Sequence, residues 1–238
     1  MIVNVSVEED SYLKCPPPPQ YDFALPPPID CSDAGDFQNI DIVLPPPPMF
    51  SDSLVREEGD KELISIGTSL VGGLGSALTA LGTKAINYVY RGADIPRITN
   101  NIKNIISDEQ RDQQIDFYIQ CGGNDCDSEL PTSAIINNYA DMIDTIYSHC
   151  PNANIICGKI PDRLGKGLFN RKIGRVNLYL KTRSYFRKDI HFLEGCPEPS
   201  RENYRGAVHF NKKGTSTLAE NIHNFVSTFH TICSNVVN

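Results

Sequence analysis

The chain has 238 residues, 40% of them hydrophobic, which is enough for one large domain or two small ones. It contains no stretch near the roughly 18 consecutive apolar residues that a membrane span needs. The first ten residues, MIVNVSVEED, carry acids where a secretory signal has basic and then apolar residues. We therefore expect a cytoplasmic protein with no membrane partner, and the eight cysteines, sparse for a chain of this length, to be free thiols.

Charge and proline are distributed unevenly along the chain. Residues 1–60 hold 12 acids and 2 bases, whereas residues 61–238 hold 17 acids and 20 bases. Eleven of the 17 prolines lie in three runs before residue 49. Such a segment buries too little surface to fold, and polyproline II needs no internal hydrogen bonds. The sequence predicts a disordered, acidic, Pro-rich tail over 1–60, which is either a spacer or a docking site for a Pro-binding module, and a folded domain over 61–238.

The folded part alternates short apolar runs with amphipathic stretches. Strands are predicted at 62–66, 85–90, 115–120, 154–159 and 190–193. Helices are predicted at 95–106, 133–150, 168–188 and 213–232. This alternation predicts an α/β fold with a central, mostly parallel five-stranded sheet that is covered on both faces. Ligands of such sheets bind beyond the carboxyl ends of the strands.

Several polar or glycine residues follow the predicted strands. Ser69 follows the first strand, Gly92 the second, and Asn124 the third, while His209 precedes the last helix. Acyl transfer uses a serine that attacks, a histidine that takes and returns the proton, and donors that stabilise the oxyanion. The sequence therefore predicts a hydrolytic site at this edge of the sheet.

Four motifs carry a resemblance to a known family. GTSL at 67–70, Gly92, GGND at 122–125 and VHFNKKG at 208–214 resemble, in order and spacing, the conserved blocks of the SGNH (GDSL-type) hydrolases. The resemblance spans 62–232 and implies a flavodoxin-like three-layer sandwich and a serine esterase acting on a small ester. It implies Ser69 as nucleophile, His209 as base, and the Ser69 amide, the Gly92 amide and the Asn124 side chain as oxyanion hole. It implies no metal and no organic cofactor.

A narrower resemblance concerns the amino-acid sequence of three stretches in the C-terminal half. The stretches PNANIICGKIP, NRKIGRVN and HFNKKGTSTLAENI are similar to SGNH domains in open reading frames of invertebrate mobile elements. This similarity implies nothing further about the chemistry of the site.

The chain departs from the family pattern at two positions. Thr68 replaces the aspartate that usually precedes the nucleophile, and this position carries no chemical group of the reaction. Gly206 stands where the family has the triad acid, three residues before His209. A triad carboxylate stabilises the imidazolium, so its loss can cost orders of magnitude in rate. Either Glu202 or a backbone carbonyl orients His209, or the domain is a weak or catalytically retired hydrolase.

Each site residue also has an ordinary structural explanation. Ser69 suits a helix N-cap, His209 could be structural, and Asn124 with Asp125 suits an Asx turn or a cap of the next helix. Cys121 and Cys126 have no second Cys or His pair at zinc-finger spacing, which favours buried thiols over a metal site.

A basic segment supports a second hypothesis, an SGNH-fold binding module for nucleic acid. Nine bases and no acid lie between residues 163 and 188, and aromatic residues suited to base stacking are interleaved with them. The candidate contacts are Arg163, Lys166, Arg171, Lys172, Arg175, Lys181 and Arg183. A solvated helix face, or one screened by the acidic tail, explains the same pattern.

Overall fold

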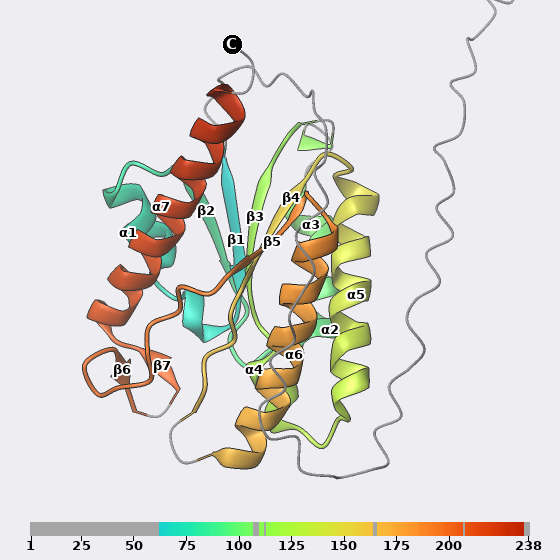
Figure 1. The fold of residues 1–238 in the computed structure, drawn as a ribbon, viewed down its shortest axis with the longest axis vertical. Helices are drawn as coiled ribbons and strands as arrows, with labels where there is room; N and C mark the ends of the chain where they lie inside the picture. Colours follow the sequence, from blue (N-terminus) through green and yellow to red (C-terminus); the bar gives the residue numbers. More distant parts are fainter. Residues whose placement is uncertain (1–61, 107–109, 112, 164–165, 207, 236–238) are drawn as a thin grey trace, which may run out of the picture. The chain divides into compact units, whose positions relative to one another are not determined.

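A central parallel sheet organises the protein in the computed structural model, which describes residues 62–235 except 107–109, 112, 164–165 and 207 (Figure 1). The predicted tail over 1–60 lies outside the described residues. The sheet has five strands in the order β2-β1-β3-β4-β5, and each neighbouring pair is parallel. The strands are β1 (Leu63–Gly67), β2 (Ala85–Val89), β3 (Asp116–Gln120), β4 (Asn154–Gly158) and β5 (Ile190–Leu193).

Helices cover both faces of the sheet. One face packs against α1 (Leu74–Ala80) and α7 (Lys212–Asn235). The other face packs against α2 (Ile95–Thr99), α3 (Ile102–Ile105), α5 (Thr132–His149) and α6 (Gly167–Phe186). Because both faces are covered, β1, β3 and β4 are buried along their whole length. This three-layer arrangement confirms the predicted fold class.

The predicted strands match the observed ones to within one or two residues, but the prediction of one continuous helix over 95–106 is wrong. The chain forms α2 and α3 instead, with a turn between them. In this turn the side chain of Asn101 donates a hydrogen bond to the carbonyl of Arg97 at 2.7 Å. Asparagine side chains compete with the helical backbone in this way, which explains the break.

Five short elements were not predicted. They are the 3-10 helix η1 (Ser69–Val71), α1, α4 (Gly123–Asp127), β6 (Tyr204–Arg205) and β7 (His209–Phe210). Four of them, η1, α4, β6 and β7, lie at the carboxyl end of the sheet, which is the lower end in Figure 1. The chemistry predicted from the sequence therefore depends on elements too short to produce a periodic pattern.

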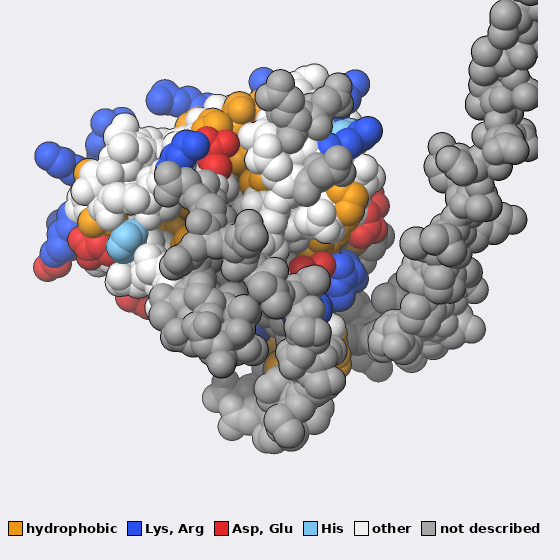
Figure 2. All heavy atoms as spheres, turned by 90° about the horizontal axis from the view of Figure 1, so that it is seen from above, with side chains coloured by type: hydrophobic (Ala, Val, Ile, Leu, Met, Phe, Trp, Pro, Cys, Tyr) orange, Lys and Arg blue, Asp and Glu red, His pale blue; other side chains and the backbone are white. Residues whose placement is uncertain are grey.

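The opposite end of the molecule has a mixed surface. Where the described residues form this face, basic and acidic side chains are interspersed with small apolar patches (Figure 2). None of the described helices is long and apolar enough to cross a membrane.

A close backbone contact between β1 and β3 sets the position of the turn after β1. Gly67 pairs with Gln120, and the amide of Thr68 donates to the carbonyl of Gln120 at 3.1 Å. A Cβ atom at position 67 would overlap this carbonyl oxygen. The glycine of the GTSL motif is therefore required by the approach of two backbones.

Two glycine substitutions test this requirement. We expect Gly67→Ala to lower the free energy of unfolding by about 1–3 kcal/mol, because the strands must separate to admit the methyl group. Gly174→Ala is the control: this glycine is exposed inside α6 and a Cβ there meets nothing within 4 Å. Alanine at position 174 should raise stability by about 1 kcal/mol. Urea unfolding followed by circular dichroism measures both, and unchanged stability in Gly67→Ala would contradict the register.

Candidate active site

The structure brings the side chains of Ser69 and His209 together across 140 residues of sequence. Ser69 is the first residue of η1, immediately beyond β1, and His209 lies in β7. The distance from Ser69 Oγ to His209 Nδ1 is 3.1 Å, within hydrogen-bond reach. The cap position of η1 is Thr68, so the alternative of Ser69 as an N-cap is wrong. When Nδ1 carries no proton, it can accept the proton of the serine hydroxyl.

The position of His209 is set by strand pairing and by the side chain of Asn211. β6 and β7 pair as an antiparallel hairpin, with Arg205 opposite His209. Asn211 follows this hairpin, and its Oδ1 accepts the amide of Gly214 at 3.0 Å in the first turn of α7. Its Nδ2 donates to the carbonyl of Glu202 at 2.7 Å. One asparagine thus joins the hairpin to the start of α7 and fixes the chain that carries His209.

No carboxylate among the described residues is hydrogen-bonded to His209. Gly206, in the position of the family's acid, has a φ of 73°, in the left-handed region. The Glu202 carboxylate accepts from Lys213 Nζ at 2.8 Å instead. This ion pair lowers the pKa of the exposed Glu202 side chain. In this structure Glu202 is therefore engaged with α7 and not with the imidazole.

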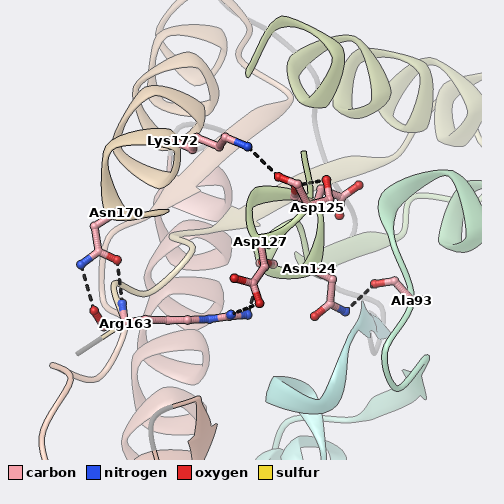
Figure 3. A network of polar contacts seen from close by, with 9 residues as sticks. Ala93, Asn124, Asp125, Asp127, Arg163, Asn170 and Lys172 are labelled. Atoms are coloured by element: carbon pink, nitrogen blue, oxygen red, sulfur yellow. Dashed lines mark hydrogen bonds and ion pairs between the residues drawn. The ribbon is translucent and has the colours of Figure 1, made fainter. Parts of the chain in front are cut away.

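The side chain of Asn124 lies against the turn that contains Gly92. Its Nδ2 donates to the carbonyl of Ala93 at 2.7 Å (Figure 3). Gly92 precedes Ala93 in the turn after β2 and has a φ of 68°, a conformation that favours glycine. A primary amide has two N–H donors, so the bond to Ala93 leaves a second one for an acceptor in the site.

Asp125, the last residue of the GGND motif, has a structural function. It is buried, and both carboxylate oxygens accept the amide of Ile95, at 3.1 and 3.2 Å. Burial raises the pKa of Asp125, and the hydrogen bond from Ile95 opposes that shift. The expectation that Asp125 caps the next helix is wrong, because Ile95 begins α2, which precedes α4 in the chain. The carboxylate joins α4 to α2.

Cysteine chemistry does not compete with Ser69 in this region. Cys121, Cys126 and Cys157 are free and buried near the carboxyl ends of β3 and β4. Burial raises the pKa of Cys126 to about 11 and that of Cys157 to about 12. These thiols therefore remain protonated at neutral pH and are poor nucleophiles. Within the described ranges, no three His, Cys, Asp or Glu side chains lie close enough together to hold a metal ion.

The candidate nucleic-acid contacts divide into engaged and exposed bases. Arg163 forms an ion pair with Asp127 at 2.7 Å, and Lys181 forms one with Glu194. Lys172 donates to two backbone carbonyls in the loop between α4 and α5. Arg183 is half-buried, with a buried Nε that has no described partner. The exposed bases with no side-chain partner among the described residues are Lys166, Arg171 and Arg175.

Comparison with known proteins defines the class of fold. No protein-family model and no curated protein matches the sequence. Among solved structures, a GDSL-like lipase from Bacteroides thetaiotaomicron has a TM-score of 0.55 at 13% identity over 74% of this chain and 92% of that one. A family 3 carbohydrate esterase from Talaromyces cellulolyticus has a TM-score of 0.53 at 15% identity over 71% and 97%. The described domain therefore has the fold of the SGNH (GDSL-type) hydrolases, and the narrower resemblance to domains of mobile elements stays a prediction.

Proposed function

We propose that residues 61–238 form a serine esterase domain that works with a Ser69–His209 pair and without a triad carboxylate. The observation that carries the proposal is the 3.1 Å contact between Ser69 Oγ and His209 Nδ1 at the carboxyl edge of an SGNH-type sheet. We propose in addition that residues 1–60 are a separate Pro-rich tail, serving as a spacer or as a ligand for a Pro-binding module.

In the proposed reaction, Ser69 Oγ attacks the ester carbonyl while Nδ1 of His209 takes the hydroxyl proton. The amides of Ser69 and Gly92 and the free N–H of Asn124 donate to the oxyanion as it forms. The imidazolium then gives its proton to the departing alkoxide, and water releases the acyl group by the same steps in reverse order. Without a carboxylate beside the ring, the imidazolium is less stable, so we expect a slow enzyme.

Labelling and hydrolysis test the proposed nucleophile. We expect the protein to hydrolyse p-nitrophenyl acetate and to be modified by a fluorophosphonate at Ser69, which mass spectrometry locates. Ser69→Ala should abolish both, and His209→Ala should greatly reduce both, because the hydroxyl then has no base. Ser76→Ala, an exposed serine on α1, is the control and should leave both unchanged. Labelling that persists in Ser69→Ala would contradict the proposal.

Placing an acid at position 206 tests whether stabilisation of the His209 imidazolium raises the rate. We expect Gly206→Asp to raise kcat about 10-fold or more, because a carboxylate near His209 stabilises the charged ring. A Cβ at this position meets nothing within 4 Å, and Asp tolerates a left-handed φ better than most residues. Gly206→Asn is the matched control, with the same shape and no charge. Equal rates in the two variants would show that charge at this position has no effect on the ring.

A second candidate function, binding of single-stranded nucleic acid, is supported by Lys166, Arg171 and Arg175. These bases are exposed at the start and along the first half of α6, in a segment without acids. Their ammonium and guanidinium groups would contact phosphates, and each contact would release counterions. Support from the aromatic residues is weaker, because Phe169 is buried beneath the guanidinium of Arg163.

Charge reversal separates binding from hydrolysis. If these three bases bind nucleic acid, single-stranded RNA should bind measurably at about 50 mM salt, and its affinity should fall steeply as the salt concentration rises. Replacing Lys166, Arg171 and Arg175 by Glu should remove this binding and leave ester hydrolysis intact. The control is the same charge change at three other exposed bases, Arg97, Lys103 and Arg111. Equal loss of binding in both triple variants, measured by fluorescence anisotropy, would indicate a non-specific charge effect.

A further inference from the structure

Asn124, the proposed oxyanion donor, lies on α4, a helix that is too short to be stable on its own. α4 has five residues, and its cap position is Gly122, with a φ of 87°. Helices this short are unstable in isolation, since nucleation costs more than one turn of hydrogen bonds returns. An oxyanion donor displaced by about 1 Å can cost about 100-fold in rate. Contacts from outside α4 must therefore fix the position of Asn124.

Arg163 supplies two such contacts, one at each end of α4. Its Nη1 donates to Asp127 Oδ2 at 2.7 Å, and its Nη2 donates to the carbonyl of Gly123 at 3.3 Å (Figure 3). The carbonyl of Gly123 belongs to the peptide group whose nitrogen is that of Asn124, and Asp127 lies at the last position of the helix. The guanidinium thus spans the helix that carries the donor.

Arg163 is itself held rigidly. Its amide donates to Asn170 Oδ1 at 2.9 Å, and Asn170 Nδ2 donates back to its carbonyl at 2.9 Å. The guanidinium lies over the ring of Phe169, 4.2 Å from its centroid, and the side chain is only 12% exposed. Figure 3 shows the side chain of Arg163, which precedes α6 in the chain, extended towards Asp127 of α4. A charged side chain that is packed and hydrogen-bonded in this way keeps one conformation, so it holds its hydrogen-bond partners in a fixed geometry.

We propose that Arg163 is a positioning residue that holds Asn124 in the geometry of an oxyanion donor. The inference rests on the proposed esterase function, because only there does the exact place of the Asn124 amide matter for rate. It assigns to the first base of the acid-free segment a function inside the site rather than on a nucleic acid. Lysine cannot replace it fully, since an ammonium lacks the planar pair of donors that reaches both acceptors.

Kinetics distinguish positioning from general destabilisation. Rates on p-nitrophenyl acetate are normalised to the sites labelled by a fluorophosphonate, so that unfolded protein does not count. We expect Arg163→Met to lower kcat about 10- to 100-fold with KM within about twofold, because oxyanion contacts act mainly in the transition state. Arg163→Lys should recover part of the loss. Lys103→Met, which changes an exposed base on α3, should match the wild type.

A double variant tests whether Arg163 acts through Asn124. In the background of Asn124→Ala, the further change Arg163→Met should cause no additional loss of kcat, because the group that Arg163 positions is already gone. Independent, multiplicative losses would overturn the proposal. If Arg163→Met does not fold, Asp127→Asn serves in its place, since Asp127 is exposed and its change removes the charged partner of Arg163.

A measurement without catalysis keeps the two proposals apart. In wild type, the Asn124 side-chain amide should give a resolved, slowly exchanging NMR signal, and so should the amide of Cys126, which donates to Gly122 at 3.0 Å. Arg163→Met should speed exchange at both, and Lys103→Met at neither. Unchanged exchange in Arg163→Met would overturn the positioning proposal. A wild type no faster than Ser69→Ala would instead overturn the esterase, and the exchange data would still decide whether Arg163 fixes α4.

Discussion

The pairing of β1 with β3 is the constraint on which the candidate site depends. Gly67 approaches the carbonyl of Gln120 so closely that no side chain fits, and the amide of Thr68 continues the ladder one residue further. The turn that carries Ser69 and the GGND turn therefore leave the sheet side by side. In a parallel sheet every such turn leaves at the same edge, so one register fixes Ser69 relative to Asn124. The β6–β7 hairpin then has to place His209 against Ser69 alone, because the position of Ser69 relative to Asn124 is already set.

The groups that hold the site are mostly backbone atoms and neutral amides. Asn211 fixes the hairpin of His209 through carbonyl and amide contacts, and Asn124 binds the carbonyl of Ala93. Such contacts orient a side chain, but they place no negative charge beside the imidazole. In a triad the carboxylate does both. In this structure the described contacts can orient side chains of the site, but no described group supplies a negative charge to stabilise the imidazolium.

The sequence predicted the sheet well because buried parallel strands read as continuous apolar runs. Ile115 to Gln120 and Asn154 to Lys159 are short runs rich in apolar residues, which favours buried strands, and the turns after them could be placed at one edge by topology alone. The sequence could not show which partner each side chain selects. Glu202 pairs with Lys213, and Asp125 with the amide of Ile95, and neither contact has a sequence spacing that distinguishes it. Helices of five residues leave no periodic signal, so α4 was also missed.

The basic segment shows how a charge pattern can mislead. A run of bases without acids is typical of a surface that binds phosphate, yet Arg163 donates to Asp127 and to the carbonyl of Gly123, and Lys172 donates to two carbonyls of the loop after α4. Short helices and tight loops leave backbone oxygens without helical partners, and these oxygens need donors from elsewhere. Arginine and lysine reach them over a distance that an amide cannot. The carbonyls of α4 and of the loop that follows it thus explain Arg163 and Lys172 in part, and only the exposed bases need another explanation.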